Sequence, residues 1–207
     1  MKVLLLNGST RKDGCTWRAL SEIANTLNTE DVDTEIVQMG AGLVRDCIGC
    51  NGCAGKGRCI FGDDLVNELI TKAEGADGFV FGSPVYYAHP SGQLLSLLDR
   101  LFYAGSGAFT HKPGAAVVTA RRAGTTASLD VLNKYMLDAQ MPIVSSTYWN
   151  MVFGPAPELV KRDAEGLQTM RNLGRNMAWL LKCVRAGQEK GANAPTAETA
   201  HWTNFNR

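Results

Sequence analysis

The sequence carries almost no net charge and contains no long hydrophobic run. Its 21 lysine and arginine residues nearly balance its 20 aspartate and glutamate residues, so the formal net charge is +1. A charge this small gives no electrostatic reason to expect nucleic acid or an anionic membrane as a partner. No apolar stretch approaches the roughly 20 residues that span a bilayer. The N-terminal MKVLLLNGS breaks into a Gly-Ser loop where a signal peptide would have its cleavage site. We therefore expect a cytoplasmic protein.

The residue patterns of hydrolases and of histidine metal sites are also missing. Of the 3 histidines, His111 and His201 have no partner at the spacing of metal ligands, and His89 lies between two loop prolines. We find no paired carboxylates and no Ser-His-Asp arrangement that would indicate hydrolysis. The sequence therefore offers no residue that we would assign as a catalytic acid, base or nucleophile.

The composition and rhythm of the chain indicate one globular α/β domain. The chain of 207 residues is 45% hydrophobic and 20% charged, which is ordinary for a protein with a full core. Short apolar runs predict five strands, at residues 3–7, 34–39, 77–82, 115–119 and 143–148. Apolar residues at helical spacing predict helices at residues 16–27, 63–73, 91–103, 126–139 and 157–184.

Strands that alternate with helices predict a parallel sheet covered on both faces. Five strands in this rhythm fit the flavodoxin-like, doubly wound order 2-1-3-4-5. We expect residues 1–187 to form this domain, with a cysteine-rich loop at residues 46–60 inserted after the second strand. Residues 188–207 are rich in Ala, Asn and Thr and predict an extended C-terminal arm.

In such a sheet, ligands bind beyond the carboxyl ends of the strands, where the strand order reverses. The loop after the first strand, residues 7–17, is rich in small and hydroxyl residues and leads directly into a helix. Backbone N–H groups and the helix dipole there favour a phosphate, and Ser9, Arg11 and Thr16 would add donors. The loop is neither a Walker motif nor a G-x-G-x-x-G motif. A polar turn without a ligand is the alternative.

Two further loops are expected at the same edge of the sheet. Residues 82–94 contain two prolines and the adjacent Tyr86 and Tyr87, which could hold a planar ring. Residues 119–126 place Arg121 and Arg122 at a strand end, where they would favour an anionic ring system. The alternatives are tyrosines that only pack and a solvated basic turn.

Several of these stretches resemble one family of flavoproteins. The segments GSTRKDGCT, CIGCNGCAGKGRC, GSPVYYAHPSGQLLSLLDR and EGLQTMRNLGRNMAWLLK resemble the NADPH-dependent FMN reductases and iron–sulfur flavoproteins of the flavodoxin-like superfamily. The resemblance extends to about residue 184. It implies FMN as cofactor, NAD(P)H as electron donor and a homodimer or homotetramer. The implied FMN-binding residues are Ser9, Arg11, Cys15, Thr16, Trp17, Pro84, Val85, Tyr86, Tyr87, Ala120, Arg121, Arg122 and Gly124. Cys15 stands where relatives usually carry Asn or Ser.

The cysteines that are clustered after the second strand follow the spacing C-x2-C-x2-C-x5-C. They are Cys47, Cys50, Cys53 and Cys59. Structural zinc usually takes two separated cysteine pairs, whereas three cysteines at x2 spacing resemble the ferredoxin run around a cubane cluster. We favour a [4Fe–4S] cluster, with zinc and empty or disulfide-forming thiols as alternatives. Because the loop follows the second strand, we expect it at the same sheet edge as FMN.

The sequence therefore predicts an FMN-dependent oxidoreductase. NAD(P)H would reduce the flavin, and electrons would pass onward, through the cluster if one is bound, to an acceptor such as free flavin, a quinone or a redox protein. An electron carrier without enzymatic activity and a thiol- or cluster-based redox sensor are the alternatives. Trp202 and Phe205 predict that the C-terminal arm docks on a neighbouring subunit and completes its active site, the alternative being an arm that folds back. We also expect a local Asp99–Arg100 ion pair and a buried Cys183.

Overall fold

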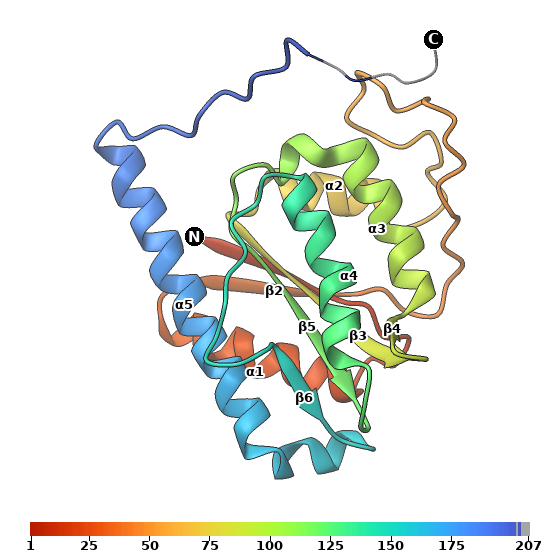
Figure 1. The fold of residues 1–207 in the computed structure, drawn as a ribbon, viewed down its shortest axis with the longest axis vertical. Helices are drawn as coiled ribbons and strands as arrows, with labels where there is room; N and C mark the ends of the chain where they lie inside the picture. Colours follow the sequence, from red (N-terminus) through yellow and green to blue (C-terminus); the bar gives the residue numbers. More distant parts are fainter. Residues whose placement is uncertain (202, 204–207) are drawn as a thin grey trace.

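The computed structural model describes residues 1–201 and residue 203, and its centre is a parallel β-sheet (Figure 1). Five strands run parallel: β1 (Lys2–Asn7), β2 (Asp33–Gln38), β3 (Gly78–Tyr86), β5 (Gly114–Ala120) and β6 (Met151–Phe153). They lie in the order β2-β1-β3-β5-β6, and the short β4 (His89–Pro90) pairs antiparallel with the end of β3. The predicted doubly wound sheet is confirmed, with β4 as an addition that the sequence did not indicate.

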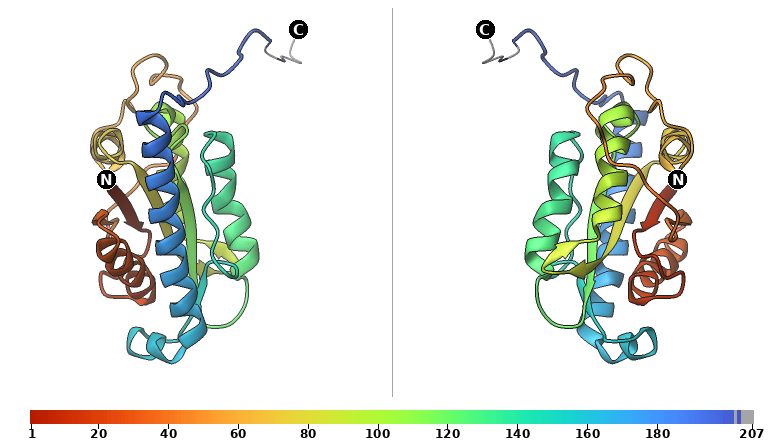
Figure 2. Two further views of the ribbon diagram at one scale, coloured as in Figure 1. Left: turned by 90° about the vertical axis from the view of Figure 1, so that its left-hand side faces the viewer. Right: turned by 90° about the vertical axis from the view of Figure 1, so that its right-hand side faces the viewer.

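The helices cover both faces of the sheet, as Figure 2 shows from two sides. They are α1 (Cys15–Thr29), α2 (Val66–Glu74), α3 (Gly92–Gly105), α4 (Thr125–Asp138) and α5 (Ala164–Glu189), with 3-10 turns η1 (Ser106–Ala108) and η2 (Pro157–Arg162). Side chains alternate along β1: Leu4 and Leu6 enter the core under α2, α3 and α4, whereas Val3 and Leu5 enter the core under α1 and α5. Both faces of the central strands are buried, which is why those strands read as continuous apolar runs.

Two predicted elements are wrong in their bounds. Residues 143–148 are not a strand; only Ile143 forms an isolated bridge, with Gly114, and the strand that pairs with β5 is β6. The predicted helix at 157–184 begins instead as η2, and α5 starts after Asp163 and continues to Glu189. Asp163 ends the first segment because its carboxylate accepts a hydrogen bond from the backbone N–H of Gly166 at 2.9 Å and caps α5.

The C-terminal arm leaves the end of α5 that lies opposite β4 and β6 (Figures 1 and 2). Residues 192–199 are exposed and form neither helix nor strand. The carbonyl of Pro195 lies 3.2 Å from Nε2 of His111, a contact between the arm and the body of the molecule. Among the described helices, none is both long enough and apolar enough to cross a membrane.

Candidate functional site

Loops from four strands surround one cleft at the carboxyl edge of the sheet. The cleft encloses about 210 Å³. The residues of the expected FMN set that line it are Ser9, Arg11, Cys15, Thr16, Pro84, Val85, Tyr86, Ala120 and Arg121. Four residues that sequence reasoning missed also line it: Gly14, Thr119, Gly154 and Pro155. The last two follow β6, which lies later in the chain than the predicted fifth strand at residues 143–148.

The buried amide of Asn7 and the half-buried amide of Gln38 hold the first loop of the cleft in shape. The side-chain amide of Asn7 donates to Oε1 of Gln38 at 2.5 Å, and its own oxygen accepts from the backbone N–H of Ser9 at 3.3 Å. Nε2 of Gln38 donates to the carbonyl oxygen of Ser9 at 2.6 Å. These bonds connect the ends of β1 and β2 to the loop and fix its path before α1 begins. The sequence pattern gave no sign of this role for Asn7 and Gln38.

The N-terminus of α1 opens at this cleft without a side-chain cap. Its N-cap is Gly14, for which the described residues supply no capping side chain, so the N–H groups of the first turn remain available to an anion. Ser9 is buried and its Oγ accepts from the backbone N–H of Arg11 at 3.2 Å, which leaves the hydroxyl proton to donate. Gly8 must be glycine because an added Cβ would lie 2.7 Å from the carbonyl oxygen of Gly82. These features fit the phosphate of a mononucleotide.

Thr16 and Cys15 take part in contacts within the protein. The hydroxyl of Thr16 is hydrogen-bonded to that of Thr119 at 2.9 Å, and this contact forms part of the floor of the cleft. Sγ of Cys15 donates to the carbonyl oxygen of Gly154 at 3.5 Å. Burial raises the pKa of the Cys15 thiol above its usual value. The thiol therefore remains neutral at pH 7, and Cys15 brings no negative charge to a site suited to an anion.

The β3–β4 hairpin forms one wall of the cleft. Its two turn residues, Tyr87 and Ala88, have φ angles of 52° and 59°, the left-handed conformation that two-residue hairpins require. Ala88 lies against the turn before α4, where a Cβ on Gly124 would approach the Cα of Ala88 to 2.4 Å. Gly124 itself has φ 88°. Only glycine fits here, and the close approach holds the hairpin against the turn that carries Arg121.

The remaining residues of the expected FMN set do not line the cleft. They are Trp17, Tyr87, Arg122 and Gly124. Tyr87 projects fully into solvent, and Gly124 acts through the packing just described. Of the two adjacent arginines, the structure brings only Arg121 to the cleft, which separates two residues that the sequence could not distinguish.

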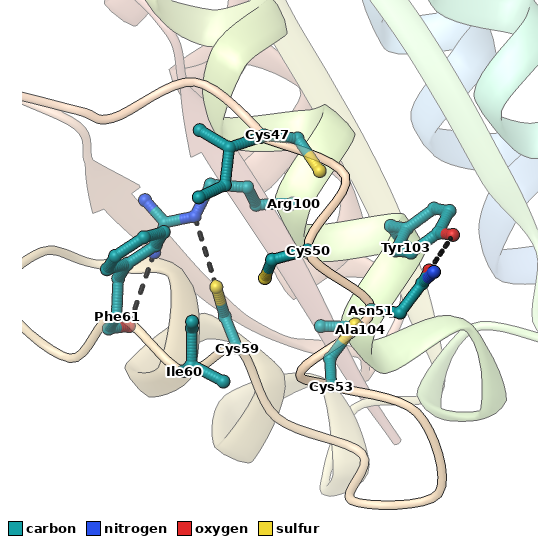
Figure 3. Close-up of a pocket in the computed structure, with 11 residues that line it drawn as sticks. Cys47, Cys50, Asn51, Cys53, Cys59, Ile60, Phe61, Arg100, Tyr103 and Ala104 are labelled. Carbon is teal, nitrogen blue, oxygen red and sulfur yellow. Dashed lines mark hydrogen bonds between the residues drawn. The ribbon is translucent and has the colours of Figure 1, made fainter.

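The cysteine loop forms a second pocket, which all four clustered cysteines line (Figure 3). The loop runs along α3: Gln93 donates to the carbonyl oxygen of Gly42, Ser96 donates to Asp46, and the Tyr103 hydroxyl donates to Oδ1 of Asn51 at 2.9 Å. The pocket therefore lies at the C-terminal end of α3, about 12 to 18 Å along the helix from its start beside β4. The expectation that the cysteines share a sheet edge with the FMN cleft is wrong, because these bonds draw the loop along the helix.

A buried ion pair supports the wall of the cysteine pocket. Arg100 is 2% exposed, pairs with Asp64, and donates from Nε to Sγ of Cys59 at 3.3 Å. The expected Asp99–Arg100 pair is wrong, since the carboxylate of Asp99 accepts a hydrogen bond from Tyr135 instead. Adjacent helix residues point in different directions, so Asp99 and Arg100 face different neighbours.

Four cysteine sulfurs are the candidate metal ligands of this pocket. None of the six cysteines, all of which lie among the described residues, forms a disulfide, and Cys183 is exposed, which contradicts its expected burial. Tetrahedral zinc, with Zn–S bonds of about 2.3 Å, needs its sulfurs roughly 3.8 Å apart. Among the described residues, no three His, Cys, Asp or Glu side chains are gathered closely enough to hold a single ion. Four cysteines nevertheless line one pocket, and cysteine sulfur is a ligand of both zinc sites and iron–sulfur clusters.

Comparisons with known proteins agree with this geometry. The profile of the family described as NADPH-dependent FMN reductase matches residues 1–156. An iron–sulfur flavoprotein of Methanocaldococcus jannaschii is 34% identical over 193 residues, which cover 89% of this chain and 100% of the relative. Among solved structures, a flavodoxin from the domain Archaea has a TM-score of 0.60 at 16% identity, covering 88% of this chain and 99% of its own. A flavone reductase has a TM-score of 0.69 at 17% identity, covering 89% of this chain and 64% of its own.

Proposed function

Since the chain belongs to the NADPH-dependent FMN reductase family, we propose that this oxidoreductase holds FMN in the cleft described above and a [4Fe–4S] cluster in the cysteine pocket. FMN supplies the capacity to accept hydride from NAD(P)H and to release electrons singly or in pairs. The cluster would add one-electron transfer. The observation that carries the proposal is the convergence of the uncapped α1 N-terminus, the Pro84–Tyr86 segment and Arg121 on one cleft.

Each wall of the cleft has a defined task in this proposal. The first turn of α1, Ser9 and Arg11 bind the phosphate, because backbone N–H groups and a guanidinium are the donors that phosphate prefers. The backbone of Pro84 to Tyr86 would hold the flavin ring, and Arg121 would favour the negatively charged, reduced flavin. No side chain needs to act as acid or base in the hydride step.

In this proposal the cysteine pocket takes an iron–sulfur cluster and not a single zinc ion. The supporting observations are the compact spacing of the four cysteines, their position around one pocket and the iron–sulfur flavoprotein of M. jannaschii to which the chain is similar. Cys47, Cys50, Cys53 and Cys59 would be the ligands. We further infer that the acceptor is free flavin, a quinone or another redox protein, and that the protein works as a cytoplasmic homodimer or homotetramer.

A visible spectrum of protein purified without oxygen tests both cofactors. FMN gives absorption bands at about 375 and 450 nm, and a cubane cluster adds a broad shoulder at about 400 nm. Iron, zinc and acid-labile sulfide assays identify the metal, and Cys50→Ser should abolish the shoulder. Cys183→Ser is the matched control because Cys183 is an exposed cysteine outside the pocket. Protein that never takes up FMN would refute the flavin proposal, and a zinc-loaded or metal-free pocket would refute the cluster. Steady-state oxidation of NADH or NADPH separates an enzyme from an electron carrier.

A further inference from the structure

The guanidinium of Arg100 donates hydrogen bonds to residues at both ends of the cysteine loop. Nε donates to Sγ of Cys59 at 3.3 Å, Nη1 to the carbonyl oxygen of Arg45 at 3.3 Å and to Asp64, and Nη2 to the carbonyl oxygen of Phe61 at 3.2 Å. Figure 3 shows the guanidinium beside the sulfur of Cys59. One side chain of α3 thus connects the segment before the cysteines to the segment after them.

Stability alone gives little reason for a charged residue at this position. Arg100 lies on α3 within the leucine-rich stretch LLSLLDRLF, and its side chain is 1% exposed while that of Asp64 is 4% exposed. Removing both charges from water is costly, and an apolar pair of similar volume is often as stable or more stable. The buried pair therefore points to a task that an apolar side chain could not perform.

Cys59 is the cysteine that most needs an external support. The x2 spacing joins Cys47, Cys50 and Cys53 in one compact run, whereas five residues separate Cys59 from it. Asn67 holds the backbone of Cys59, accepting from its N–H and donating to its carbonyl oxygen, each at 2.9 Å. Arg100 holds the sulfur. Backbone and sulfur of Cys59 are thus fixed from two different helices, α2 and α3.

We propose that Arg100 is a positioning residue for the fourth cluster ligand and sets the reduction potential of the cluster. This inference rests on the proposed [4Fe–4S] cluster. An N–H donated to a ligand sulfur withdraws electron density from it and favours the reduced, more negative cluster, which raises the potential. Asp64 balances the charge of the guanidinium at close range. The effect therefore comes mainly from the directed Nε–H bond, and a lysine at this position would not reproduce it fully.

The test compares the loaded wild-type protein with Arg100→Gln, Arg100→Lys and Arg45→Gln. Arg45 is the matched control: its guanidinium also lies near the Phe61 ring, at 5.5 Å from the centroid, but binds Asp63 and is exposed. The readouts are the midpoint potential of the cluster, followed by electron paramagnetic resonance, the iron and sulfide content, and the circular dichroism spectrum. We expect a lower potential in Arg100→Gln, a smaller decrease in Arg100→Lys and the wild-type value in Arg45→Gln.

The possible outcomes separate this inference from the proposal beneath it. A fully loaded Arg100→Gln with the wild-type potential would overturn the inference. So would a variant that loses iron while its remaining clusters keep the wild-type potential, since Arg100 would then only support the fold. If Arg100→Gln fails to fold, Arg100→Lys decides, because an unchanged potential in that folded variant also contradicts the inference. A wild-type protein without iron and sulfide would instead refute the cluster itself, and the inference with it.

Discussion

The hydroxyls of Thr16 and Thr119 are paired at 2.9 Å, which joins the first turn of α1 to the end of β5 beneath the candidate flavin cleft. Both residues are buried, at 1% and 4% exposure. The N-terminal end of α1 and the strand that precedes Arg121 are therefore held together by a contact between two buried residues. We expect this contact to stabilise the cleft without touching the ligand through its hydroxyls.

Replacing Thr16 by valine tests that division of roles. The change keeps the shape but leaves the Thr119 hydroxyl buried without its partner, so we expect a loss of about 1–3 kcal/mol in the free energy of unfolding. The double variant Thr16→Val/Thr119→Val should recover part of this loss, since neither hydroxyl is then left unpaired. Urea denaturation of the FMN-free protein measures both. A double variant as unstable as the sum of the single variants would contradict the pairing.

Arg11→Ala should weaken FMN binding, because Arg11 lines the cleft beside the N-terminus of α1. The expected loss is about 1–3 kcal/mol, the range for a hydrogen bond to a charged group. Quenching of flavin fluorescence on binding gives the dissociation constant. Lys12→Ala is the matched control, since Lys12 is an exposed cation of the same loop outside the lining. Equal losses in the two variants would show that general charge, and not a contact from Arg11, attracts the phosphate.

Arg121→Ala should lower the midpoint potential of bound FMN, whereas Arg122→Ala should leave it nearly unchanged. A positive charge at the cleft favours the anionic reduced flavin, and only Arg121 of this pair lines the cleft. A spectroscopic redox titration of each variant measures the effect. A potential that stays constant or rises in Arg121→Ala would exclude this role, and a decrease confined to Arg122→Ala would reverse the assignment.

The sequence predicted the central strands well and the last strand poorly, for a physical reason. β1, β3 and β5 are buried on both faces and are therefore continuous apolar runs that end in glycine or polar loops. β6 has three residues, too few for a periodic pattern to be visible. Residues 143–148 imitate a strand, yet their polar groups bind α5: Asn176 donates to the carbonyl oxygen of Ser145 at 2.8 Å, and Asn172 donates to Thr147 at 3.1 Å.

The candidate site was predictable where it depends on loops at strand ends and unpredictable where it depends on long-range side-chain contacts. The position of Arg121 follows from the strand that it ends. In contrast, the Arg100–Cys59 contact joins residues 41 positions apart, and the loop that carries Cys59 is placed by bonds to α3. The order of strands and helices predicts where this loop begins, but it does not predict which residues its side chains contact. The sequence therefore could not show that the cysteine pocket lies away from the candidate flavin cleft.

The wild-type protein should have a higher free energy of unfolding than Glu35→Gln at neutral pH, but not in acid. Hydrogen bonds from Lys2, at 2.5 Å, and then from Lys72, at 2.7 Å, lower the pKa of Glu35 from its usual value of 4.5. A group whose pKa is lowered in the folded state contributes stability above the unfolded pKa and loses it as pH falls through the folded pKa. The difference should therefore be complete at pH 7 and vanish in acid. It should stay below about 1 kcal/mol, because the pair is partly exposed.

Urea denaturation at pH 7 and in acid measures this difference, and 1 M salt provides the control. At this ionic strength the screening length is about 3 Å, so the advantage of wild type at pH 7 should shrink. An advantage that persists unchanged in acid would show that Glu35 stabilises the protein through packing and not through its charge.

The C-terminal arm remains the part of the chain whose proposed role depends on a second subunit. It leaves the molecule from the end opposite the candidate flavin cleft of its own chain (Figure 1), and residues 192–199 are exposed. Such an arm is too polar to fold by itself. The aromatic residues that motivated the proposal, Trp202 and Phe205, lie outside the described residues. Because the arm starts far from its own cleft, we propose that it reaches the cleft of a neighbour in a homo-oligomer.

Deleting residues 195–207 should therefore lower both the oligomeric mass in solution and the rate of NAD(P)H oxidation. The physical reason is that the deletion removes contact area between subunits and a cover that would exclude water from the flavin. Light scattering and steady-state kinetics measure the two effects. His111→Ala is the control for an arm that only folds back, since it removes the contact to Pro195 within the chain. If the truncated protein keeps the same number of subunits and the same rate of NAD(P)H oxidation, the arm has no part in assembly or in the active site. If His111→Ala alone reproduces the deletion, the arm acts on its own subunit.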